Sequence, residues 1–323
     1  MRLMHRCVLL AWFLTALSCL APPASRAAGS GVPPEVSAIL DKIYSFDLES
    51  ATQAAQRLQR ENPDDPLGFL LEGEASWWRI WCDSAEYKWG MTDVRHRPKL
   101  DADQRYFELA RRAYSLAVAQ NRGHESAATY FYAGMADALA ARLYALRGEN
   151  RATARVGVRA RQNFLRALEL DPECADADFG LGLYNYYVDT LGSIARMLRF
   201  FTGIPGGSKH DGVRQLETAI ASGSLTPNLA RIYLALNLHR YDQRYSRALE
   251  VLSPVAEKYP GNPLFQLMIG DLHAKLGHSD QALSHYRAAV ALPVADGDCR
   301  ARIQALAGSA SSAVAGLQAS HPK

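Results

Sequence analysis

Residues 160–172 read ARQNFLRALELDP, and the spacing of the small and aromatic residues in this stretch decides the fold. Ala160, Phe164 and Ala167 follow one another at intervals of four and three, so their side chains lie on one stripe of a helix. Alanines let two helices approach closely, and the phenylalanine fills the space between them. Pro172 then ends the helix, because proline lacks the backbone N–H that a helix interior needs.

The same spacing recurs along the chain and sets a register. A glycine stands in the helix before most copies, at Gly73, Gly134, Gly182 and Gly270. Counting from these anchors, the repeating units are about 34 residues long at both ends of the chain and longer in the middle. The further copies are Ala51, Ala55 and Leu58; Ala110, Tyr114 and Ala117; Ala248, Leu252 and Val255; and Ala282, Tyr286 and Ala289.

This pattern resembles the second helix of a tetratricopeptide repeat, which carries A-x3-F and a later proline. The resemblance covers residues 32–296 and implies an all-α fold, a right-handed α-solenoid of about six antiparallel helix pairs with a C-terminal capping helix. The expected repeats are 32–65, 66–124, 125–174, 175–228, 229–262 and 263–296, and the expected cap is 297–323.

The three middle units are longer than the others, and the sequence indicates where each gains its length. In the second, Gly90, Thr92 and Pro98 predict a loop between the helices. In the third, two long helices are expected to meet in a turn at 148–150. In the fourth, apolar residues at helical spacing predict a short amphipathic helix within an insert at 190–205.

The block NYYVDTLGSIARMLRFFTGIPGG, at residues 185–207, is similar to uncharacterised bacterial exported tetratricopeptide proteins. It is distantly similar to the tetratricopeptide-39 and inclusion-body-clearance families. This narrower resemblance implies an exported helical scaffold and supplies no catalytic residues.

Residues 1–27 read as a signal peptide. Arg2 and Arg6 form a basic start, an apolar run follows at 7–21, and Ser25-Arg26-Ala27 has the small-x-small form of a cleavage site. We therefore expect export to the periplasm or the medium, with residues 28–323 as a single repeat domain. Cys19 leaves the alternative of a lipoprotein.

Removing the signal peptide changes the charge of the protein. The full chain has 36 basic and 33 acidic residues, and residues 1–27 hold three arginines and no acids. The mature chain is therefore formally neutral, which argues against a nucleic-acid partner.

Three cysteines remain in the mature chain, at Cys82, Cys174 and Cys299. They lie in different units, so the sequence favours three separate, mostly buried thiols. One disulfide with one leftover thiol is the alternative, because an exported protein meets an oxidising environment.

Enzyme signatures are absent from the sequence, which has no HExxH, P-loop, GxSxG or CxxC motif. His273, His278 and His285 stand on both sides of Gly277 at spacings of five and seven, which favours ordinary surface histidines over a metal site. We expect no catalytic residues, no cofactor and no metal.

Four arginines step by four residues through the third unit, at Arg147, Arg151, Arg155 and Arg159. On a helix they would form one basic row, which could bind an acidic partner or phosphate groups. The plainer interpretation is a solvated face that pairs with acids from the next repeat.

The first helices of tetratricopeptide repeats line a concave groove that holds peptides in related proteins. Here only Asn237 and Arg240 resemble the polar anchors of such grooves, and the other lining residues are apolar or aromatic. The groove is therefore suited to apolar side chains of a protein or peptide partner, unless the solenoid is over-wound and these residues pack internally. The candidates are Trp77, Phe131, Phe179, Leu183, Tyr186, Tyr233, Asn237 and Arg240.

The sequence thus favours an exported, non-catalytic scaffold for protein–protein interactions in the cell envelope. One alternative is a membrane-associated envelope factor, held by the amphipathic insert at 190–205 or by a lipid on Cys19. Another is an enzyme with an unrecognised site, which the lack of any clustered nucleophile, base or metal ligands disfavours.

Overall fold

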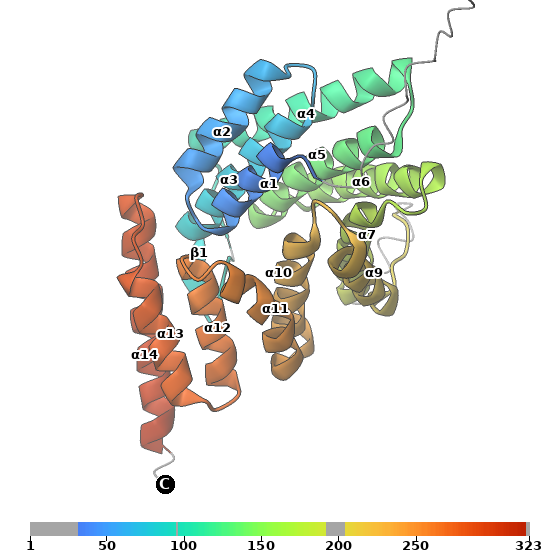
Figure 1. Cartoon of the computed structure of the whole chain (residues 1–323). Helices are drawn as coiled ribbons and strands as arrows, with labels where there is room; N and C mark the ends of the chain where they lie inside the picture. Colours follow the sequence, from blue (N-terminus) through green and yellow to red (C-terminus); the bar gives the residue numbers. More distant parts are fainter. Residues whose placement is uncertain (1–31, 95, 192–203, 321–323) are drawn as a thin grey trace, which may run out of the picture. The chain divides into compact units, whose positions relative to one another are not determined.

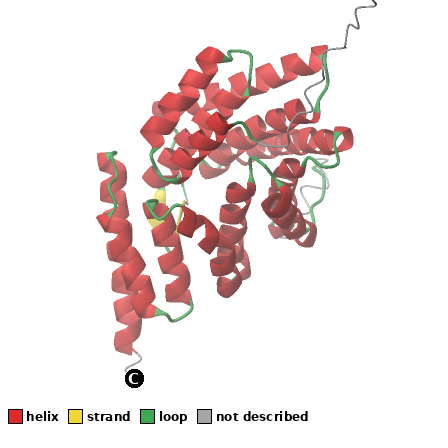
Figure 2. Ribbon diagram, in the orientation of Figure 1, coloured by secondary structure: helices red, strands yellow, loops and turns green. Residues whose placement is uncertain are grey.

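Each of the six expected units contains two helices in the computed structural model, which describes residues 32–94, 96–191 and 204–320 (Figure 1). Most of these residues are helical, and the rest form loops, turns and two short strands (Figure 2). The pairs are α1 (Pro34–Tyr44) and α2 (Leu48–Glu61), α3 (Leu67–Asp83) and α4 (Gln104–Gly123), α5 (Ala127–Leu146) and α6 (Asn150–Leu170), α7 (Ala175–Thr190) and α9 (Lys209–Ser222), α10 (Pro227–Asn237) and α11 (Tyr245–Lys258), and α12 (Pro263–Lys275) and α13 (Ser279–Ala291). The chain continues into α14 (Gly297–Ser320), which packs on α13.

Local signals place the ends of these helices where the sequence indicates. Asn262 begins α12 by accepting hydrogen bonds from the backbone N–H groups of Leu264 and Phe265. Gly148 and Gly277 adopt φ of 72° and 77° in the turns within the third and sixth units, a left-handed conformation that glycine reaches without strain. The long α5 and α6, joined by a turn at 147–149, agree with the expected hairpin.

Phe164 shows why the alanine–aromatic spacing joins one unit to the next. Its ring is fully buried between Gly134 on α5 and Gly180 on α7, and a Cβ atom on Gly134 would lie 2.6 Å from the ring. A Cβ atom on Gly180 would overlap the ring still more. Two glycines on neighbouring first helices therefore make the hole that this aromatic side chain fills.

The second unit contains a β-hairpin where the sequence predicted a loop. β1 (Ala85–Tyr87) pairs antiparallel with β2 (Thr92–Val94), with Ala85 opposite Val94. Trp89 and Gly90 make the turn with positive φ. Asp271 of α12 accepts a 2.6 Å hydrogen bond from the Thr92 N–H, so a residue of the last unit orders this segment.

Two other expected segments lie outside the described residues. These are the signal peptide at 1–27, including Cys19, and most of the insert at 190–205.

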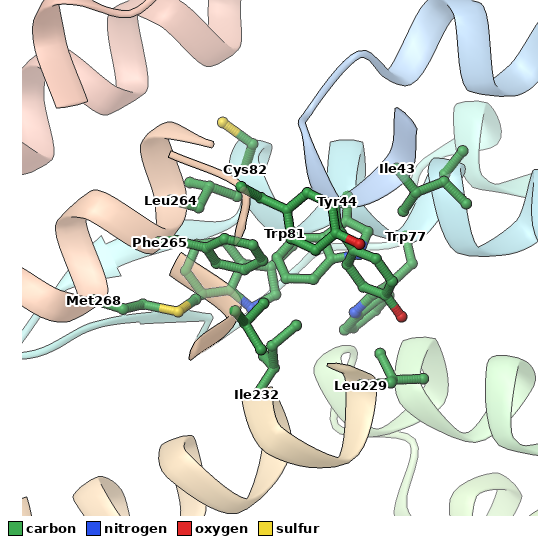
Figure 3. Close-up of a cluster of buried hydrophobic side chains, with 14 of the residues drawn as sticks. Ile43, Tyr44, Trp77, Trp81, Cys82, Leu229, Ile232, Leu264, Phe265 and Met268 are labelled. Carbon is green, nitrogen blue, oxygen red and sulfur yellow. The ribbon is translucent and has the colours of Figure 1, made fainter. Parts of the chain in front are cut away.

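The last units contact the first ones directly. Asn262 donates a 2.9 Å hydrogen bond to the carbonyl of Tyr44, and Tyr259 donates one of 2.6 Å to Asp41. The Trp78 ring on α3 meets the Phe265 ring on α12 edge to face, with centroids 5.6 Å apart. Figure 3 shows Tyr44, Trp77 and Trp81 in one cluster with residues of α10 and α12, which are Leu229, Ile232, Leu264, Phe265 and Met268.

A disulfide joins Cys82 at the end of α3 to Cys299 on α14, across 217 residues of sequence. The interpretation of three separate thiols is therefore wrong for this pair. Cys174 remains a free, partly buried thiol. The sequence could not predict this disulfide, because the pairing depends on the contact between the first and last units of the domain.

The glycines around Phe164 provide a test of this packing. Gly180→Ala would push a methyl group into the Phe164 ring, so we expect a loss of unfolding free energy of about 1–3 kcal/mol. Gly157→Ala, at a helical position with open space around it, should instead raise the unfolding free energy by about 0.5–1 kcal/mol. Urea unfolding of the two variants measures both changes, and equal effects of the two substitutions would contradict the described packing.

Candidate functional site

The structure brings the predicted groove residues together, but in the interior of the protein. Trp77, Phe131, Phe179, Tyr186 and Asn237 are each at most 5% exposed. The remaining three, Leu183, Tyr233 and Arg240, are half-buried. A partner therefore has no access to most of this set in the described conformation.

A buried ion pair lies at the centre of the face that these groove residues form, which we call the inner face. Arg142 of α5 donates to Glu74 of α3 at 2.5 Å and to the hydroxyl of Tyr233 on α10 at 3.3 Å, and it lies over the Trp77 ring. Burial by itself would lower the pKa of Arg142, but the adjacent Glu74 carboxylate outweighs it and raises the pKa above its usual value. The guanidinium is therefore charged, and the pair joins α3, α5 and α10.

Hydrogen bonds and a ring contact also fill the inner face around Tyr186 and Phe179. Tyr186 donates hydrogen bonds to Asp242 at 2.8 Å and to the carbonyl of Asn237 at 3.2 Å. The Phe179 and Tyr233 rings meet edge to face, with centroids 5.9 Å apart. The alternative of an over-wound solenoid with internal packing accounts for these residues, and an open groove does not.

Of the predicted groove residues, Arg240 lines an open cleft. It forms an ion pair with Asp93 of the hairpin, beside a cleft of about 550 Å³. The cleft lies between the hairpin, the π-turn at Leu238–Asp242 and the start of α11. Its lining residues are Trp89, Met91, Val94, His239, Arg240, Tyr241, Gln243, Tyr245 and Lys275. We call it the hairpin cleft.

Exposed aromatic residues stand at the hairpin cleft. Trp89 at the tip of the hairpin is 72% exposed, and Tyr241 is 42% exposed. Lys275 holds the tip by donating a 2.6 Å hydrogen bond to the carbonyl of Trp89, and the Lys88 ammonium lies 4.9 Å from the Trp89 ring centre. Gln243 follows the π-turn with a positive φ of 54°, a conformation that costs free energy in a residue other than glycine.

Sequence reasoning missed Trp89, since it lies in no helical pattern. The available signal was a lone tryptophan next to glycine in a segment predicted to be a loop. Hydrophobic periodicity gives no information about such a residue.

The arginine row does not form one free basic surface. Arg147 pairs with Asp103 at 2.7 Å, and Arg159 pairs with Asp137 at 2.5 Å. These acids come from the preceding and the same unit, so the expected pairing with acids of the next repeat is wrong. The other two arginines, Arg151 and Arg155, are exposed, and neither forms an ion pair with a described residue.

The three histidines of the last unit lie together. The Nδ1 atoms of His273 and His278 are 3.3 Å apart, and the His273 and His285 rings stack with centroids at 5.4 Å. Burial lowers the pKa of both His273 and His285, which favours the neutral rings. Within the described residues, no group of three or more His, Cys, Asp or Glu side chains is arranged to hold a metal ion. In the same residues, none of the helices is both long and apolar enough to cross a bilayer.

Comparison with known proteins supports the repeat architecture. Residues 233–296 match the family model of the tetratricopeptide repeat. These residues, from within α10 to the end of the loop after α13, are therefore similar to tetratricopeptide repeats. They include the copies of the sequence spacing that begin at Ala248 and Ala282, whereas the copy at Ala160, Phe164 and Ala167 lies outside the match.

Two solved structures are similar to this chain at low sequence identity. One is the C-terminal part of a repeat-containing protein from Cytophaga hutchinsonii, with 12% identity, a TM-score of 0.34, and coverage of 79% of this chain and 78% of that one. The other is the Cut9–Hcn1 hetero-tetramer of the APC/C, with 10% identity, a TM-score of 0.41, and coverage of 84% of this chain and 48% of that one. No curated protein matches the chain. The similarity of residues 185–207 to exported bacterial proteins stays a prediction.

Asp271, which holds the hairpin, gives a pH-dependent prediction. Burial raises the pKa of this carboxyl to about 7, from 3.8 in an exposed setting. The folded protein therefore favours the neutral acid, and its unfolding free energy should fall as pH rises between about 4 and 7, by at most about 1.4 kcal/mol per pH unit. Asp271→Asn should flatten this slope.

Urea unfolding at several pH values between 4.5 and 8 measures the effect. Asp280→Asn, at an exposed acid of the next helix, serves as the control and should keep the wild-type slope. An unchanged slope in the Asp271 variant would show that this carboxyl does not titrate in the stated range.

Proposed function

We propose that this protein is an exported, non-catalytic scaffold that holds a protein partner at the hairpin cleft. Tetratricopeptide repeats generally present surfaces for protein–protein contacts, and the observation that selects this surface is the 72% exposure of Trp89 beside Tyr241. Exposed tryptophan and tyrosine side chains that line a cleft are typical of the centre of an interface.

The charges around Trp89 favour a particular kind of partner. The ammonium groups of Lys88 and Lys275 lie next to the tryptophan, and the nearby Arg240 is paired with Asp93. A complementary segment would place an apolar side chain over Trp89 and acidic residues beside the two lysines. The partner we propose is therefore a protein segment in which acidic residues flank an apolar one.

Two independent features support export. The first 27 residues have the order of a signal peptide, and the paired Cys82 and Cys299 fit an oxidising compartment.

The buried side chains of the inner face support a binding surface on the outside, because the inner groove of this solenoid is filled.

A photo-crosslinking amino acid at position 89 tests the proposed surface in cells. We expect a specific crosslink to an envelope protein from position 89, and none from Val290, another exposed apolar position, which lies on α13 and is 42% exposed. With the identified partner, Trp89→Ala should weaken binding by at least about tenfold, as removal of an interface tryptophan does. Equal crosslinking from both positions, or unchanged affinity in the variant, would contradict the proposal.

N-terminal sequencing of the natural protein tests export separately. We expect the mature chain to begin near Ala28. An intact Met1 would refute export, and a lipid on Cys19 would support the membrane-anchored alternative.

A further inference from the structure

A second cleft lies between α4, α5 and α6, and it shares no residue with the hairpin cleft. Its volume is about 520 Å³, within the range of about 300–1,000 Å³ that is usual for small-ligand pockets. Aromatic residues and two members of the arginine row line it, among them Phe107, Tyr114, Tyr144, Arg147 and Arg159.

Two of the three aromatic residues that line this cleft are in contact with each other. The Phe107 and Tyr144 rings pack with centroids 4.7 Å apart. The Arg147 guanidinium lies 5.1 Å from the centre of the Phe107 ring, and that of Arg159 lies 4.4 Å from the centre of the Tyr114 ring. Each arginine thus lies over an aromatic ring of the cleft.

Buried aspartates fix the two arginines in place. Asp137 accepts hydrogen bonds from Nε and Nη2 of Arg159, which leaves Nη1 without a partner among the described residues. Asp103 accepts from Nη2 of Arg147 and also from Arg97. Burial raises the pKa of Asp103, but these hydrogen bonds outweigh it and the pKa stays below its usual value, so the carboxylate is charged.

Arg147 keeps an unused hydrogen-bond donor. Its side chain is only 9% exposed, and its Nε atom is buried without a hydrogen-bond partner. A buried donor without a partner is unfavourable, and a hydrogen bond to an acceptor atom of a ligand would offset this cost.

The charges that line the cleft indicate the charge of the ligand. They are three arginines, Arg111, Arg147 and Arg159, and two aspartates, Asp101 and Asp137, so one positive charge is in excess. Arg111 is exposed and forms no ion pair with a described residue. A ligand with one negative charge balances this excess. A doubly charged phosphate would exceed it, and the two aspartates would repel the phosphate.

We propose that this cleft binds a small organic monocarboxylate with an aromatic or aliphatic body. The carboxylate accepts hydrogen bonds from the guanidinium groups, and the body packs on Phe107, Tyr114 and Tyr144. The site is independent of the protein-binding surface at the hairpin cleft.

Calorimetric titration of the mature protein with 3-phenylpropionate tests this site. We expect saturable binding of the acid, and binding at least about tenfold weaker for the uncharged 3-phenylpropionamide, because the amide lacks the charge-assisted hydrogen bonds. Phenyl phosphate at pH 8 should also bind more weakly than the acid. No saturable binding of the acid, or equal or tighter binding of either analogue, would overturn the proposal.

Two substitutions show whether the probe binds in this cleft. Arg111→Gln should weaken binding of 3-phenylpropionate by about tenfold, whereas Arg112→Gln, the next residue, which faces the Phe69 ring instead, should leave it unchanged. Ser115→Phe should fill the cleft from its exposed edge and abolish binding, with an unchanged thermal unfolding midpoint. Undiminished binding in either the Arg111 or the Ser115 variant would place the probe elsewhere and overturn the proposal.

Discussion

Helix α3 is apolar on nearly all of its faces, and such a helix has to be covered on every side. Leu67, Leu70, Trp77, Trp78 and Trp81 are all buried, although a helix in an open solenoid would expose one side. The neighbouring α2, α4 and α5 cover part of this surface, and α14 packs on α3 as well. The remainder is covered by residues of α10 and α12, which come from the fifth and sixth units. The burial of α3 thus accounts for the contact between the two ends of the repeat domain.

This closure also explains the buried polar groups. Glu74 on α3 would be an isolated charge in the interior without Arg142, and the pair is costly to bury unless its hydrogen bonds are satisfied. Tyr233 and the Trp77 ring provide two of the contacts that make the arrangement acceptable. With the inner face filled, the two clefts described above, the hairpin cleft and the cleft between α4, α5 and α6, are lined by residues other than the predicted groove residues, except for Arg240.

The sequence predicted the helix pairs well because their signals are local. The spacing of Ala160, Phe164 and Ala167 and the turn glycines act within one unit, and the structure has helices where these signals place them. The contacts that join the two ends of the domain link residues more than 200 positions apart, such as Asn262 with Tyr44 and Cys82 with Cys299, and periodicity holds no information about them. The groove candidates were therefore correctly grouped on the first helices, but nothing local distinguished a filled inner face from an open one. The arginine partners Asp103 and Asp137 were missed because the spacing of the arginines does not indicate which acids face them.

Zero-length crosslinking with a carbodiimide tests the closure most directly. Lys258 and Asp41, in the fifth and first units, lie 3.1 Å apart, and Lys99 and Glu149, in the adjacent second and third units, lie 3.5 Å apart. In the monomer we expect mass spectrometry to find both amide links, because both pairs are ion pairs in the closed domain. The Lys99–Glu149 link without the Lys258–Asp41 link would show that the two ends of the domain are apart, and it would contradict the account.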